Sequence, residues 1–306
     1  MKKNLAIAYS GTSTQIAIAY GVAHGLYDSG IMPDLYEGCS GGDIVKALHA
    51  SERFDEDVLQ MILDFQLSDV FNKPPVKANG KMSATAIFRG LTMRKSLGEQ
   101  RALTKTFKKY FTPDDLAYIK SKRRHLYSTI TSYGYRKALH VRNSRNNYEA
   151  MVSNVMASGR IPVFTEGFDM KLDKGHDVWF DGGVLDHNGG KYFAKRKDVK
   201  TLITVWSRPE ENPESPSFIP WKQKNWFDTN LKTHNVRSHG ISIEDENHID
   251  LLCYVNGVNH IKIMPNKDFQ EETYRFDRDN NIRMYEHGYE IAVAKAQRIR
   301  DLHGIK

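Results

Sequence analysis

The order of apolar runs and turns in the first fifty residues constrains the fold more than any other feature of this sequence. A short apolar run, Leu5–Tyr9, ends in a loop of small residues, and helical spacing then covers Ile16–Asp28. A second short run, Leu35–Gly38, leads through glycines into another helical pattern that starts at Gly42. A buried strand followed by a helix, repeated, is typical of a parallel sheet. The sequence therefore predicts an α/β fold with a mainly parallel central sheet.

Later segments add further elements to this plan. The stretch 55–120 is predicted to be mainly helical. Beyond it we expect strands at His125–Tyr133, Arg136–Arg142, Thr201–Trp206, Leu251–Val255 and Ile261–Met264, and helices at Tyr148–Ala157 and Asn281–Leu302. Four prolines between Arg208 and Trp221 predict a loop. No repeat or low-complexity tract divides the chain, so we expect one domain over 1–306, with a flap or insertion at 208–227.

The charge of the chain favours anionic partners. Its formal net charge is +7, and ten basic residues fall between Arg94 and Arg124. Such a stretch forms either a solvated helical face or a surface that contacts anionic phospholipid headgroups. No nucleic-acid-binding motif accompanies it, so we expect no nucleic acid partner.

Cysteine content and hydropathy indicate the compartment. Cys39 and Cys253 are the two cysteines, too few for a disulfide framework, which favours a reducing environment. No apolar run approaches the ~20 residues of a membrane-spanning helix. The basic start is followed by a run too short for a signal peptide. We expect a cytoplasmic protein whose contact with membranes, if any, is peripheral.

The segment Gly38-Cys39-Ser40-Gly41-Gly42 matches the pattern G-x-S-x-G. Between a strand and a helix, this pattern makes a sharp turn that exposes the central serine, and its glycines let the backbone bend tightly. The N-terminal end of the following helix favours the negative charge that develops during acyl transfer. The alternative is a glycine-rich turn with an unreactive serine.

A nucleophilic serine needs a base within hydrogen-bond reach. Seven of the 12 histidines follow Asp181, so the order Ser-Asp-His of the α/β-hydrolases could be assembled. None of these histidines lies in a recognisable motif. Asp181 does, because an apolar run, Val178-Trp179-Phe180, leads into Asp181-Gly182-Gly183. An ordinary Asp-Gly turn would look the same.

Taken together, these motifs resemble the patatin-like phospholipases. The family has a glycine-rich loop after its first strand, a Gly-Val helix, a Pro-Asp that leads into the serine elbow, an A-x-x-x-x-P segment and a D-G-[GA] motif. The corresponding segments here are, in chain order, Ser10–Gln15, Gly21-Val22, Pro33-Asp34 with 38–42, Ala157–Pro162, and Asp181-Gly182-Gly183, and Met284–Tyr289 is similar to the closing helix.

The resemblance implies a three-layer α/β/α fold and fatty-acyl ester substrates. No cluster of His, Cys and carboxylate residues has metal-ligand spacing, so we expect no metal and no cofactor. It implies a Ser40–Asp181 dyad, with Asp181 as the base and no histidine. Backbone N–H groups of Gly11, Thr12 and Ser13 would form the oxyanion hole. This loop departs from the family pattern, because Thr12 and Ser13 stand where glycines occur and Gln15 replaces a basic residue. A positive φ at Thr12 would be strained.

Other functions remain open at this stage. A chain with this fold could have lost efficient chemistry and serve as a lipid-binding or scaffolding protein. Ser10–Gln15 could instead cradle a nucleotide phosphate, although it lacks the spacing of known phosphate loops. The tryptophans of the 208–227 flap, Trp221 and Trp226, either contact a membrane surface or pack onto the protein's own core.

Overall fold

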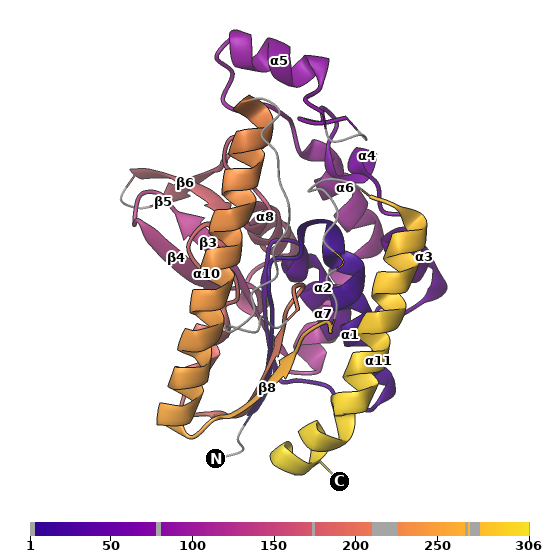
Figure 1. Ribbon diagram of the computed structural model, residues 1–306. Helices are drawn as coiled ribbons and strands as arrows, with labels where there is room; N and C mark the ends of the chain where they lie inside the picture. Colours follow the sequence, from indigo (N-terminus) through magenta and orange to yellow (C-terminus); the bar gives the residue numbers. More distant parts are fainter. Residues whose placement is uncertain are drawn as a thin grey trace.

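The computed structural model describes residues 4–77, 81–172, 175–209, 226–266, 269 and 276–305. Within them, one eight-stranded sheet has the order β5-β6-β3-β2-β1-β7-β8, and β4 pairs with β3 (Figure 1). The strands are β1 (Asn4–Tyr9), β2 (Leu35–Cys39), β3 (His125–Ser132), β4 (Lys137–Arg142), β5 (Phe168–Leu172), β6 (Gly175–Asp181), β7 (Val199–Val205) and β8 (Asn259–Ile263).

The sheet is mixed but mostly parallel. Strand β1 pairs in parallel with β2 and β7, β2 with β3, and β7 with β8. Strands β4 and β6 run antiparallel to β3, and β5 runs antiparallel to β6. The predicted α/β class with a mainly parallel sheet is therefore confirmed, and the antiparallel strands gather at one edge.

Helices cover both faces of the sheet. The described helices are α1 (Ile16–Asp28), α2 (Gly41–Ala50), α3 (Glu56–Leu63), α4 (Leu67–Val70), α5 (Ala84–Leu91), α6 (Arg101–Tyr110), α7 (Pro113–Ser121), α8 (Tyr148–Ser158), α9 (Gly190–Ala194), α10 (Trp226–Asn256) and α11 (Arg278–His303). None of the described helices is both long enough and apolar enough to cross a bilayer.

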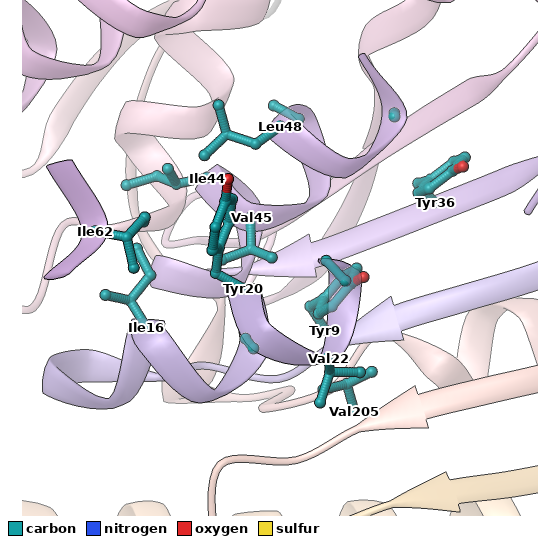
Figure 2. Packing of buried hydrophobic residues seen from close by; sticks show 14 of the residues in the cluster. Tyr9, Ile16, Tyr20, Val22, Tyr36, Ile44, Val45, Leu48, Ile62 and Val205 are labelled. Carbon is teal, nitrogen blue, oxygen red and sulfur yellow. The ribbon is translucent and has the colours of Figure 1, made fainter. Parts of the chain in front are cut away.

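Two apolar clusters give the protein its three layers. The larger cluster packs α1, α2, α3, α6, α8 and α11 against one face, and Figure 2 shows part of it, with members from β1, β2 and β7 beside α1, α2 and α3. The smaller cluster packs α9 and α10 against the other face. Strand β1 serves both, since Ile7 and Tyr9 belong to the larger cluster and Ala6 and Ala8 to the smaller. Burial on both faces explains why its sequence is apolar without alternation.

Glycines let α11 lie directly against α1. A β-carbon added to Gly21 would lie 2.1 Å from the carbonyl oxygen of Tyr285, and one added to Gly288 would lie 2.3 Å from that of Ile18. The two helices therefore touch backbone to backbone. This contact gives a physical reason for glycine in the Gly21-Val22 segment and in the closing helix.

The structure corrects one sequence prediction and leaves another mostly outside the described residues. Leu251–Val255 is not a strand but the last turns of α10, in which Cys253 is buried while Leu251, Tyr254 and Val255 are exposed. Strand β5 was not predicted. Of the proposed flap 208–227, residues 210–225 lie outside the described part, Arg208 is buried against Ser242 and Glu246, and Trp226 begins α10.

The basic stretch 94–124 falls on α6, on α7 and on the loops around them. Lys105, Lys109 and Arg123 are exposed, as a solvated face requires. Arg124 is different, because it is buried and its guanidinium lies 2.5 Å from the carboxylate of Glu52. The stretch is therefore partly structural and partly a solvated surface.

Candidate active site

Ser40 occupies a sharp turn between β2 and α2. Its backbone angles, φ 54° and ψ −128°, are rare for a residue with a side chain and mark local strain. The flanking glycines make the turn sterically possible. A β-carbon on Gly38 would lie 2.5 Å from the Cα of Asp43, and one on Gly42 would lie 2.3 Å from the carbonyl oxygen of Ser10. The turn presents the half-buried Ser40 at the carboxyl end of β2.

A second serine supports this turn from behind. The backbone N–H of Ser40 donates to the hydroxyl of Ser158 at 2.9 Å, and that hydroxyl donates to the carbonyl of Thr129 at 2.8 Å. Ser158 is fully buried at the end of α8. The sequence gives no signal for this role, because the contact joins residues 118 positions apart.

Asp181 ends strand β6 and reaches Ser40 across β3. Strand β3 pairs with β2 on one side and with β6 on the other, where Ile130 lies opposite Asp181. The Asp181 carboxylate accepts hydrogen bonds from the Gly183 N–H at 2.8 Å and from the Cys39 thiol at 3.6 Å, and the Ser40 hydroxyl lies close enough to lower its pKa. The structure thus brings Ser40 and Asp181 close together.

Burial changes the pKa of the Asp181 carboxylate. Removal from water raises the pKa of Asp181 to about 6, while the nearby Ser40 hydroxyl and the hydrogen bonds from Gly183 and Cys39 act in the opposite direction. A group with this pKa is ionised at neutral pH and can still accept a proton from a nearby hydroxyl. That is the balance required of a general base.

The loop after β1 lies beside the turn and is firmly held. The Gly11 N–H donates to the carbonyl of His187 at 3.0 Å, and the Ser207 hydroxyl donates to the carbonyl of Gly11 at 3.1 Å. Thr12 has φ −110°, so the strain expected of a β-branched residue at positive φ does not arise. Because the Gly11 N–H is already hydrogen-bonded, the candidate oxyanion donors that remain are the backbone N–H groups of Thr12 and Ser13, at the start of a 3-10 turn (Ser13–Gln15).

His187 lies close to this site. A β-carbon added to Gly11 would lie 3.2 Å from the Nε2 of His187, and one added to Gly183 would lie 3.4 Å from its Cδ2. Its ring therefore packs between the loop and the Asp181 turn. Of the other described histidines, His140 lies 3.6 Å from Asp186, which follows the Asp181 turn, and His260 pairs with Asp250 at 2.6 Å.

Buried charges secure the elements around the site. Beneath Ser40, Asp43 in the first turn of α2 pairs with the fully buried Lys46, whose ammonium also donates to the carbonyl of Tyr127 at 3.0 Å. Beside Asp181, Lys191 lies 3.4 Å from Asp186 and 2.5 Å from Asp245. These residues were not predicted, since a charged residue in sequence does not reveal that its partner is buried with it.

A largely apolar pocket adjoins the serine. Its empty volume is about 570 Å³, part of it open to solvent. Ser40 and Gly41 lie in its wall, and the other residues that line it are Ile16, Ile44, Phe65, Val70, Phe71, Gln100, Leu103, Val155, Gly159, Ile161 and Phe276. Such a lining suits a long hydrocarbon chain better than a polar substrate.

Comparison with models of known protein families matches residues 7–192 to the patatin-like phospholipases. The chain belongs to this family. The match spans both Ser40 and Asp181 and ends within α9. The elements that follow it, β7, α10, β8 and α11, complete the sheet and its two helical layers.

None of the curated proteins matches this sequence. Among the 13 solved chains that match is VipD from Legionella pneumophila, which is 13% identical over 97% of this chain and 67% of that one, with a TM-score of 0.44.

Proposed function

We propose that this patatin-like chain is a lipid acyl hydrolase that uses Ser40 as nucleophile and Asp181 as its only catalytic partner. The observation that carries the proposal is that strand pairing through β3 places these two side chains close together beside an apolar pocket, with Ser40 in its wall. The serine lies in a strained turn, and the aspartate is buried, which are the conditions under which a hydroxyl and a carboxylate act as nucleophile and base.

The first half of the reaction forms an acyl-enzyme. The Ser40 oxygen attacks the carbonyl carbon of a fatty-acyl ester while its proton passes to Asp181. The N–H groups of Thr12 and Ser13 and the N-terminal end of α2 stabilise the negative oxygen of the tetrahedral intermediate. The C–O bond to the alcohol then breaks, and the alcohol leaves with the proton from Asp181.

The second half returns the enzyme to its starting state. A water molecule attacks the acyl carbon and gives a proton to Asp181. The bond to Ser40 breaks, the serine oxygen regains the proton, and the free fatty acid leaves. Phospholipids and lysophospholipids are the proposed substrate class, because the pocket suits an acyl chain and the chain's net charge of +7 suits anionic headgroups.

The alternative is a lipid-binding or scaffolding protein with little or no catalysis. It is consistent with the hydrogen bond from the Gly11 N–H to the carbonyl of His187, because this donor is then not free to bind an oxyanion. Loss of one oxyanion donor typically costs ~10²–10³ in rate. The closeness of the Ser40 hydroxyl to the Asp181 carboxylate favours the hydrolase.

A digest of mixed phospholipid vesicles, followed by mass spectrometry, tests the function. We expect the wild-type chain to release free fatty acids and the Ser40→Ala variant, with an unchanged melting temperature, to release none. Ser121→Ala, an exposed serine at the end of α7, is the control and should act as wild type. Equal release by the Ser40→Ala variant would exclude this assignment.

A further inference from the structure

Helix α5 turns its apolar side chains towards solvent. Ile87, Phe88 and Leu91 are 50%, 62% and 80% exposed, and Met93, just beyond the helix, is 94% exposed. Arg89, on the same helix, is only 7% exposed. We call the four apolar residues the α5 face. A helix on a soluble surface normally does the reverse, so the α5 face needs an apolar partner to cover it.

Buried ion pairs fix the helix in this orientation. The guanidinium of Arg89 lies 2.6 Å from the carboxylate of Glu99 and 2.9 Å from that of Glu166, and it also donates to the carbonyl of Ser96 at 2.9 Å. The Ser83 hydroxyl caps the start of the helix by accepting from the Ala86 N–H at 3.0 Å. Rolling the helix to bury its apolar side chains would break these bonds and leave a buried charge unpaired, which is strongly disfavoured.

Basic side chains flank helix α5 in sequence on both sides. They are Lys77, Lys81, Arg94 and Lys95, which are all exposed, and we call them the basic rim. The nearest acidic groups are largely engaged, because Glu99 and Glu166 pair with Arg89, and the exposed Asp169 lies 3.9 Å from Lys95. An exposed apolar helix face with a basic rim has the composition of a helix that lies in the interface of an anionic membrane.

The α5 face lies at the same end of the molecule as the pocket. Figure 1 shows α5 at the top, beyond α4 and α6 and opposite the N-terminus from which β1 rises. The segment that leads from α5 into α6 is tied to the core by Gly98, whose N–H donates to the carbonyl of Phe164 at 3.0 Å. Gln100 and Leu103, which follow directly, line the pocket beside Ser40.

We propose that the α5 face inserts into the boundary between headgroups and acyl chains of an anionic phospholipid surface, with the basic rim on the headgroups. The inference rests on the proposed function, because it places the pocket against the surface that holds the lipid substrate. A protein partner would also cover the apolar side chains, but it would not account for both the basic rim and the neighbouring apolar pocket.

Co-sedimentation with vesicles tests the proposal in the Ser40→Ala background, in which the lipid stays intact. We expect binding to vesicles of phosphatidylcholine and phosphatidylserine that weakens with added salt and with removal of phosphatidylserine. The double change Phe88→Ser and Leu91→Ser should weaken binding about tenfold or more, since each side chain would lose its apolar contact.

A matched control uses exposed apolar residues at the other end of the molecule. Tyr254 and Val255 are 86% and 69% exposed at the end of α10, just before β8 begins at the amino edge of the sheet. The double change Tyr254→Ser and Val255→Ser should leave vesicle binding unchanged. Equal binding by the two double variants would overturn the proposal. So would self-association of the unchanged chain through the α5 face, measured by sedimentation velocity, without any vesicle binding.

The two proposals can fail separately. If the chain with Ser40 intact hydrolyses neither vesicle lipid nor a short soluble ester, the proposed function fails, whatever the Ser40→Ala chain binds. If it hydrolyses the soluble ester and the α5 change does not slow vesicle hydrolysis, the surface proposal fails alone. We expect the α5 change to slow vesicle hydrolysis while turnover of the soluble ester and the melting temperature stay as in wild type.

Discussion

At the scale of single residues, the titration of Asp181 governs the chemistry. Burial raises its pKa to about 6, and only the ionised carboxylate can accept the proton of Ser40. We therefore expect kcat/KM for a soluble ester to rise as pH increases through about 6 and then to level off. A pH–rate profile of the wild-type chain measures this midpoint. A rate that is flat between pH values of about 5 and 8 would contradict the role of Asp181.

A change at Cys39 tests whether Asp181 is the group that titrates near pH 6. The hydrogen bond from the Cys39 thiol lowers the pKa of Asp181, so the Cys39→Ala change should move the midpoint of the profile to higher pH. Asp43, whose pKa burial also raises to about 6, has no such bond to Cys39, so a shift identifies Asp181 as the titrating group. Cys253, the other buried cysteine, lies on α10, and Cys253→Ala is the control with an unchanged midpoint.

At the scale of elements, the contact between α1 and α11 depends on glycine. Adding a methyl group at Gly288 would force it to within 2.3 Å of the Ile18 carbonyl oxygen, so the helices must separate. We expect Gly288→Ala to lower the free energy of unfolding by about 1–3 kcal/mol or more, measured by urea denaturation. Gly240→Ala, on α10 where no atom of the described residues would lie within 4 Å of the added methyl group, should be neutral or stabilising by up to about 1 kcal/mol. Equal effects of the two changes would exclude close helix packing as the cause.

Elements with strong local patterns were predictable from the sequence. The helix over Ile16–Asp28 follows from the periodicity of its apolar residues, which acts over a few residues. The run Leu251–Val255 misled the prediction, because five apolar residues fit a strand or the end of a helix equally well. Only packing decides, and here Ile249 and Cys253 face the sheet at helical spacing.

At the scale of the whole molecule, the sheet order assembles the site. Strand β3 lies between β2 and β6 and so joins Ser40 to Asp181, which are far apart in sequence. The motifs predicted these two residues, because the glycines that each turn requires stand next to the functional residue in the sequence. They could not predict Ser158, Lys191 or the carbonyl of His187, whose roles depend on contacts between distant segments. The outward-facing α5 was also beyond sequence analysis, since its orientation depends on the ion pairs of Arg89.

Labelling with a fluorophosphonate, followed by peptide mapping, tests the central claim most directly, because the probe reacts only with an activated serine. We expect one adduct, at Ser40, in the wild-type chain and none in Ser40→Ala. Asp181→Asn should slow labelling by about 10²-fold or more, since an amide cannot take the proton. His187→Ala should label within a few-fold of wild type, roughly the effect of a lost packing contact. Labelling of Asp181→Asn at the wild-type rate, or loss of labelling in His187→Ala, would contradict a dyad formed by Ser40 and Asp181.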